Sequence, residues 1–188
     1  KGAAELVIRS EMNSFLKQIN SNIILSSARA GNVIGGGDWS DNRIIPDCSK
    51  AWSKLEEVVI RQPYATRPWQ HVLEPLSGYL QLASYLKKNH DLNGESFNFG
   101  PSNIEEFSVL DLVKEMKVNY LRDVKWKIKE ENNILHKESK LLKLNCDKAF
   151  KLLKWKSTLN FYETVQFTSS WYNDYYSKNF DINITSKQ

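Results

Sequence analysis

Apolar side chains recur every three or four positions in several stretches of the chain, a spacing that gathers them on one face of a helix. The stretches with this spacing are residues 2–18, 45–55, 75–88, 109–120, 146–153 and 161–176. Pro75 stands at the first turn of its stretch, where a helix tolerates proline. Ser108 and Asp111 form a capping-box pattern ahead of the fourth stretch. We therefore predict a helix in each of these stretches.

Shorter apolar runs between these stretches are typical of strands. Residues 23–28 form a continuous apolar run that is too short for a helix, which favours a parallel strand buried on both faces. Further strands are predicted at residues 58–60, 69–72 and 96–99, and the alternating residues 125–129 indicate an exposed strand. Helices that alternate with short buried strands predict an α/β fold with a parallel sheet, continued into a smaller mixed lobe.

A glycine-dense loop, residues 31–39, follows the first predicted strand. Ligands bind at the carboxyl ends of parallel strands, and glycine lets the backbone approach a ligand closely. A Walker A loop is excluded, because Gly37-Asp38 stands where Lys and Ser or Thr are required. A dinucleotide fingerprint is excluded as well, because residues 38–42 open no helix. A substrate-side binding loop and a structural turn remain equally supported.

Two arginines, Arg61 and Arg67, flank Tyr64 and precede Trp69. Guanidinium groups bind phosphates through paired hydrogen bonds, and aromatic neighbours suit a stackable base. The pattern therefore fits a diphosphate that carries a base. The alternative is a pair of surface arginines packed over aromatic rings. His71, on the same predicted strand, is interpreted as a packed histidine rather than a ligand.

Composition changes this picture little. The 188 residues are 41% hydrophobic and 26% charged, which is typical of one soluble globular unit. The net charge of +4 is too small to indicate a polyanion partner. The lysine-rich residues 110–156 contain no nucleic-acid-binding motif and are interpreted as a solvated face. No apolar run is long enough to span a bilayer.

The cysteines indicate the cellular compartment, and the first residues indicate whether the chain is a fragment. Cys48 and Cys146 are far apart and lack the spacing of a metal site, so we expect no metal and a reducing cytoplasm. The chain opens at Lys1 directly inside a helical pattern and without a methionine, so we interpret it as a fragment. Taken alone, Lys1 is an ordinary solvated side chain.

Two stretches, residues 28–39 (ARAGNVIGGGDW) and residues 67–80 (RPWQHVLEPLSGYL), resemble the CDP-glucose 4,6-dehydratases, a family of extended short-chain dehydrogenase/reductases. Weaker similarity continues through residues 97–101 and 142–149, so the resemblance covers nearly the whole chain. Asn145 departs from the family, which usually has aspartate at this position.

The resemblance implies an α/β fold, comprising the C-terminal part of a Rossmann-type parallel sheet and a smaller mixed α/β substrate-binding lobe. The Rossmann part is expected mainly in residues 1–35 and 69–100. The lobe is expected mainly in residues 36–68 and 101–176, with a frayed tail at residues 177–188. The glycine fingerprint of the dinucleotide site and the acid/base residues of the dehydration step are expected upstream of Lys1.

The resemblance also implies an activity. The complete protein would dehydrate CDP-glucose to CDP-4-dehydro-6-deoxyglucose through transient hydride transfer to bound NAD. This reaction belongs to deoxysugar biosynthesis for surface polysaccharides such as the O-antigen of lipopolysaccharide. A cytoplasmic homo-oligomer is expected, without membrane or nucleic-acid partners. The alternatives are another sugar-nucleotide epimerase, reductase or decarboxylase of the superfamily, or a catalytically incomplete nucleotide-sugar-binding fragment.

Three site residues follow from the resemblance. Lys1 would be the lysine of the family's Tyr-x-x-x-Lys motif, serving catalysis and cofactor binding, with the tyrosine upstream of the chain. An ammonium beside a phenol favours the phenolate and lowers its pKa toward the operating pH. Asn32 and Arg67 match positions that contact the sugar nucleotide, Arg67 at the diphosphate. Arg29 precedes the glycine loop, and its role stays open.

Overall fold

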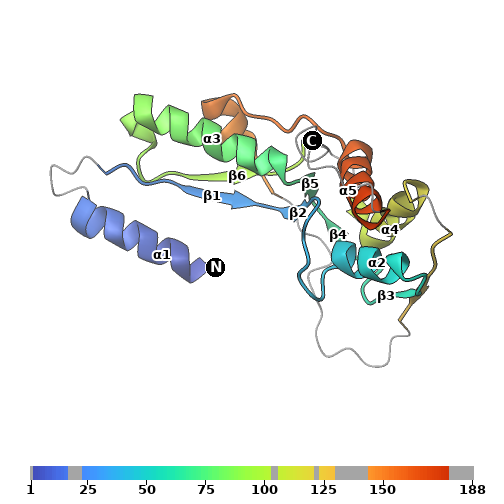
Figure 1. Ribbon diagram of the computed structural model, residues 1–188. Coiled ribbons are helices and arrows are strands. Elements are labelled where there is room, and N and C mark those ends of the chain that lie inside the picture. The colour runs from blue at the N-terminus through green and yellow to red at the C-terminus, as the bar shows by residue number, and fades with distance from the viewer. Residues whose placement is uncertain (1, 17–22, 103–105, 121–122, 130–143, 178–188) are drawn as a thin grey trace.

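The computed structural model describes residues 2–16, 23–102, 106–120, 123–129 and 144–177 (Figure 1). Lys1 therefore lies outside the described residues, as does all but the first residue of the predicted tail at 177–188. In the part of the chain that the structure describes, no helix is long and apolar enough to cross a membrane.

Two parallel strand pairs form the backbone of the fold. Strand β1 (Ser27–Ala30) pairs with β6 (Ser96–Phe99), and β2 (Asn32–Ile34) pairs with β5 (Trp69–His71). Only Gly31 separates β1 from β2, so one run of chain passes from one partner strand to the other. The predicted α/β class with parallel strands is confirmed.

The first strand differs from its prediction. Residues 23–26 approach the sheet without strand pairing, and β1 begins at Ser27, where the Ser27 and Ser96 hydroxyls hydrogen-bond at 2.7 Å. β2 lies inside the segment predicted as a loop. The start of β1 is set by its pairing with Ser96, and β2 is hidden in the sequence because it has only three residues and lies in a glycine-dense segment.

The helices follow the predicted stretches closely. They are α1 (Gly2–Glu11), α2 (Ile44–Ser53), α3 (Leu73–Lys88), α4 (Val109–Val118) and α5 (Phe161–Tyr176). The predicted capping box of Ser108 and Asp111 is present, and Asn160 with Glu163 forms a second one before α5. In Figure 1 the β1–β6 pair lies between α3 and α1.

Two π-helical turns and one 3₁₀ turn accompany the α-helices in the described residues. The helix predicted at residues 2–18 continues past α1 as a π-helical turn, Met12–Leu16. The helix predicted at residues 146–153 is mainly a second π-helical turn, Ala149–Leu153, which Lys154 ends with a left-handed backbone. A 3₁₀ turn, His90–Leu92, leads into β6.

Two further strand pairs complete the strands of the described residues. β3 (Val58–Ile60) pairs in parallel with β8 (Trp126–Ile128), and β4 (Thr66–Arg67) pairs antiparallel with β7 (Phe107–Ser108). The predicted strands at residues 58–60 and 125–129 are thus confirmed. Figure 1 shows β3 with α2, α4 and α5 gathered at one end of the molecule, away from α1.

The buried side chains form two cores. The larger core unites residues of α2, α4 and α5 with Ile60 of β3, Ile34 of β2 and Trp69 of β5. The smaller core packs α3 on β6 and the second π-helical turn; its buried members are Leu82, Leu92, Phe97, Phe99, Ala149, Leu153 and Trp155. Because Ile34 and Trp69 come from the β2–β5 pair, this pair anchors the larger core to the parallel strands.

Two buried polar side chains tie these parts together. The Gln70 amide on β5 donates to the Phe99 carbonyl of β6 at 2.9 Å, which joins the two parallel pairs. The Glu74 carboxylate in the first turn of α3 accepts the backbone N–H groups of Thr158 and Leu159 at 2.9 and 2.7 Å. The segment before α5 is therefore fixed to the start of α3.

The contact of α3 with β6 depends on Gly78, because a Cβ there would lie 2.2 Å from the Phe99 ring. We expect Gly78→Ala to lower the free energy of unfolding by about 1–3 kcal/mol through overpacking, although alanine favours a helix. Gly2→Ala is the matched control, since a Cβ on this helical glycine meets nothing within 4 Å. Urea unfolding followed by tryptophan fluorescence measures both, and equal effects would contradict the packing argument.

Candidate functional site

A cavity of about 1010 Å³ opens where β2, β5 and the start of α2 meet. Its lining includes Asn32 and Arg67, the two residues implied to bind a sugar nucleotide. It also includes Gly31 and Gly35, beside the ends of β2. The structure thus brings Asn32 and Arg67 to one cavity, and their binding role stays a prediction.

The strand register sets the position of Asn32 and Arg67. Asn32 lies opposite Trp69 in the β2–β5 pair, and Arg67 ends β4 only one residue before β5. A Cβ on Gly31 would lie 2.8 Å from Pro68 Cγ, so glycine allows this close approach. The Arg67 guanidinium donates to the Thr66 carbonyl at 2.8 Å, which steadies the side chain.

The second arginine of the sequence pattern, Arg61, also lines the cavity. It donates to the Asn42 side-chain oxygen at 3.0 Å and to the Asn42 carbonyl at 3.1 Å. Of the two aromatic neighbours, Trp69 lines the cavity with its indole N–H bound to Phe107. Tyr64 is 75% exposed and is absent from the lining. The arginines of the pattern are therefore brought together, with one of their two aromatic partners.

Helix α5 holds the glycine turn that borders the cavity. A Cβ on Gly36 would lie 2.2 Å from the Trp171 ring, and the Tyr172 hydroxyl donates to the Asp38 carbonyl at 2.7 Å. The Trp39 ring contacts the rings of Trp171, Tyr172, Tyr175 and Tyr176. Sequence reasoning missed this docking, although the aromatic residues of α5 carried a signal for it. The loop is thus a structural turn at Gly36 and cavity lining at its two ends.

The Asp38 carboxylate is fully engaged by neighbouring residues of the chain. Burial acts to raise the pKa of the Asp38 carboxyl, but the Ser40 N–H at 2.9 Å and the Arg43 guanidinium at 3.1 Å outweigh burial and lower it. Lys50 reaches the same loop from α2 and donates to the Trp39 carbonyl at 2.8 Å. The loop donors therefore occupy both Asp38 oxygens, and this carboxylate shapes the cavity wall.

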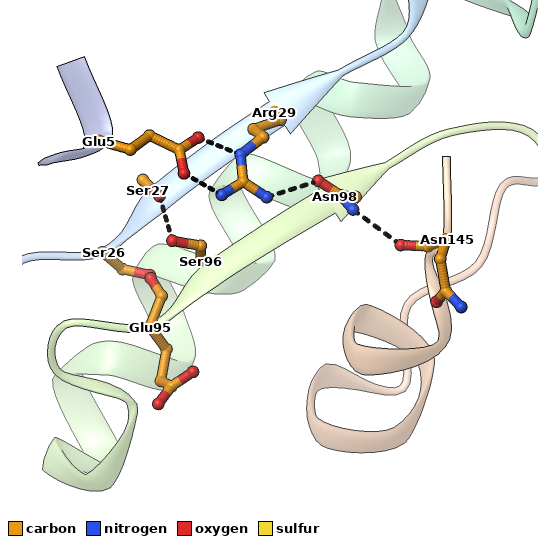
Figure 2. A network of polar contacts seen from close by, with 8 residues as sticks. All are labelled: Glu5, Ser26, Ser27, Arg29, Glu95, Ser96, Asn98 and Asn145. Carbon is orange, nitrogen blue, oxygen red and sulfur yellow. Dashed lines mark hydrogen bonds and ion pairs between the residues drawn. The ribbon is translucent and has the colours of Figure 1, made fainter. Parts of the chain in front are cut away.

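Arg29 has a structural role. Its guanidinium pairs with both oxygens of the Glu5 carboxylate, and it donates to the Asn98 amide oxygen at 3.1 Å. Asn98 in turn donates to the Asn145 carbonyl at 2.9 Å (Figure 2). The pairing lowers the pKa of Glu5 and raises the pKa of Arg29. Arg29 thus joins α1, the β1–β6 pair and the segment before the second π-helical turn, outside the cavity lining.

The turn at Gly36 does not form the phosphate cradle of a dinucleotide. The Trp171 ring occupies the space beside Gly36, where a glycine-rich phosphate loop would need open backbone. Lys1, the residue implied to touch the cofactor, lies outside the described residues. Within the described ranges, no group of three or more His, Cys, Asp or Glu side chains could hold a metal ion. The glycine turn is therefore no phosphate-binding loop, and the cofactor contact implied for Lys1 stays a prediction.

The chain is similar in sequence to a curated enzyme. No protein-family model matches the chain. It is 41% identical over 175 residues to CDP-glucose 4,6-dehydratase of Salmonella typhimurium, an alignment that covers 92% of this chain and 48% of that protein. The chain therefore spans about half the length of this curated relative.

Solved structures with the same fold include two nucleotide-sugar enzymes. UDP-glucose-4-epimerase of Stenotrophomonas maltophila, with bound NAD and formylated UDP-arabinopyranose, superposes with a TM-score of 0.73 at 15% identity, over 93% of this chain and 55% of that one. dTDP-glucose 4,6-dehydratase of Bacillus anthracis, in complex with NAD, superposes with a TM-score of 0.70 at 15% identity, over 98% and 53%. At this identity the two likenesses show the shared fold alone.

The predicted packing role of His71 agrees with its surroundings. Its side chain is almost fully buried and lies 6.1 Å from the Phe167 ring, centroid to centroid. Nδ1 accepts the Leu73 N–H at 3.4 Å, and Nε2 finds no hydrogen-bond partner among the described residues. Burial lowers the pKa of His71 below its ordinary value, so the folded protein favours the neutral ring.

This shift predicts a loss of stability in mild acid. The unfolded chain binds a proton at His71 below about pH 6.5 while the folded chain resists it, so stability falls as the pH drops from there toward the folded pKa. We expect His71→Phe, which keeps a ring facing Phe167, to flatten this part of the pH dependence. Urea unfolding of both proteins between about pH 5 and pH 7 measures it. Parallel curves would contradict the shift.

Proposed function

Because the chain belongs to the family of the CDP-glucose 4,6-dehydratases, we propose that it supplies the substrate side of an enzyme that converts CDP-glucose to CDP-4-dehydro-6-deoxyglucose with NAD as cofactor. The observation that carries the proposal is that Asn32 and Arg67 line the same cavity. The 41% identity to CDP-glucose 4,6-dehydratase supports it.

The charges of the cavity support a diphosphate ligand. Its cationic lining residues are Arg43, Arg61, Arg67 and Lys129, and its acidic ones are Asp38 and Asp47. Since Arg43 and Asp38 pair with each other, the remaining cations exceed the remaining acid. Guanidinium groups bind phosphate oxygens through short charge-assisted hydrogen bonds. A nucleoside diphosphate sugar fits this balance.

In this proposal the cavity residues bind and orient the substrate. Arg67 holds the diphosphate and Asn32 contacts the sugar nucleotide, so the distant nucleotide supplies the binding energy that positions the sugar. NAD supplies a reversible hydride acceptor when bound. Lys1 is proposed to favour the phenolate of an upstream tyrosine and to contact the cofactor.

The wider setting is part of the proposal. The product class points to deoxysugar biosynthesis for surface polysaccharides, and the family resemblance supports a homo-oligomer. A reducing cytoplasm is supported by Cys48 and Cys146, which are both free thiols. We also propose the division into a Rossmann part and a substrate lobe, which is supported by the larger core, because most of its residues come from the ranges of the lobe.

The fold is similar to that of UDP-glucose-4-epimerase, so a second candidate function is that of an epimerase of the same superfamily. The two candidates differ in mass balance, because dehydration removes one water from the sugar nucleotide whereas epimerisation leaves its mass unchanged. A protein that binds the nucleotide sugar without turnover would leave both its mass and its stereochemistry unaltered.

We expect the full-length protein to release a sugar nucleotide lighter by one water when it is incubated with CDP-glucose and NAD and no added reductant. The hydride returns to the sugar within each turnover, so no net NADH should form. Mass spectrometry of the product and absorbance of NADH measure both. An isomer of unchanged mass would indicate the epimerase, and no product with saturating NAD would reject the dehydratase.

Loss of the proposed diphosphate contact should appear in substrate binding. We expect Arg67→Ala to raise KM for CDP-glucose by roughly 30- to 150-fold, which corresponds to about 2–3 kcal/mol for a charge-assisted hydrogen bond. Lys88→Ala, which removes an exposed cation at the end of α3, is the control and should leave KM unchanged. Steady-state kinetics measure KM for both variants. If Arg67→Ala also keeps the parental KM, Arg67 does not bind the diphosphate.

A further inference from the structure

One acidic side chain of the cavity has no task in the proposed diphosphate site. Asp47 lies in the first turn of α2, lines the cavity and keeps 34% of its side chain exposed. It accepts a hydrogen bond from the Asn42 backbone, and its ion pair with Arg61, at 3.7 Å, is longer than a hydrogen bond, so part of the carboxylate stays available. By contrast, the carboxylate of Asp38 is taken up by Ser40 and Arg43. Asp47 therefore retains acceptor capacity that a ligand donor can use.

Arg61 gives this carboxylate a fixed neighbour. Two hydrogen bonds to Asn42 hold the Arg61 guanidinium, so its plane is oriented before any ligand binds. Val59, two residues earlier, lines the cavity as well and is 43% exposed. A carboxylate acceptor, a planar cation and an apolar side chain thus come together on one part of the lining. Planar heteroaromatic rings are recognised by this combination.

The negative charge of Asp47 limits which group of a bound ligand can lie next to it. A carboxylate repels phosphate oxygens, so Asp47 is unsuited to the diphosphate and must face a hydrogen-bond donor. Among pyrimidine bases, cytosine presents an exocyclic amine, and carboxylates accept from this amine. Uracil and thymine present a carbonyl at the same place, which leaves two acceptors facing each other.

We propose that Asp47, oriented by Arg61, selects a cytosine nucleotide by accepting a hydrogen bond from the exocyclic amine of the base. The inference rests on the proposed function, because it requires the cavity to hold a nucleoside diphosphate sugar. It adds a specificity residue to that site: Arg67 binds the diphosphate that nucleoside diphosphate sugars share, and Asp47 distinguishes the base.

Calorimetric titration of the full-length protein with CDP and with UDP tests this assignment without turnover. The parental protein should bind CDP at least about tenfold more tightly than UDP. Asp47→Asn should remove most of that preference, because the amide can donate to the uracil carbonyl as well as accept from the cytosine amine. Asp47→Glu, which keeps the carboxylate, should retain part of the preference and serves if the asparagine variant does not fold.

Two controls separate base selection from other effects. Asp41→Asn makes the same chemical change on an 88% exposed side chain outside the cavity lining, and it should leave the CDP-to-UDP ratio unaltered. Arg67→Ala should weaken both nucleotides by the same factor. An unchanged ratio in Asp47→Asn, or equal affinities in the parental protein, would overturn the role of Asp47 and leave the dehydratase proposal standing. Failure of the parental protein to bind either nucleotide would overturn both proposals.

Discussion

The register between β2 and β5 is the constraint on which the cavity depends. Asn32 faces Trp69 across the pair, and Pro68 alone separates Trp69 from Arg67, so the register places both candidate ligand residues at once. Gly31 makes this geometry sterically allowed beside Pro68. A slip of one residue would turn every side chain of the strand to the opposite face. The two candidate binding residues are therefore positioned by strands, Asn32 by the parallel β2–β5 pair and Arg67 by β4, which pairs antiparallel with β7.

Buried polar groups keep the scaffold in this arrangement. Gln70 links the two parallel pairs through the Phe99 carbonyl, and Glu74 fixes the segment that leads into α5. Both side chains are nearly inaccessible to water, where an unpaired polar group is costly. Each bond therefore favours one relative placement of its two segments. The position of the cavity wall therefore depends on the Gln70 bond on β5 and on the placement of α5.

Local pattern predicted the elements whose cause is local. The strands at residues 58–60 and 96–99 and the helix at residues 161–176 have the predicted bounds, because apolar spacing and capping residues define them. β2 was missed because its three residues lie in a glycine-dense segment, and the role of Arg29 stayed open because Glu5 and Asn98 meet it only in the folded state. The cavity could be anticipated from the family resemblance, whereas the placement of Asp47 in its lining required coordinates.

The docking of α5 on the glycine turn has a consequence for synthesis on the ribosome. The hydrogen bond between Tyr172 and Asp38 joins residues 134 positions apart, and Trp171 fills the space beside Gly36. The turn is translated early and its buttress late, and contacts of such long range form slowly. A nascent chain that ends before α5 would contain the arginines that line the cavity but lack the contacts of Trp171 and Tyr172 with the turn. We therefore expect this part of the cavity wall to take its final form only after α5 has been translated.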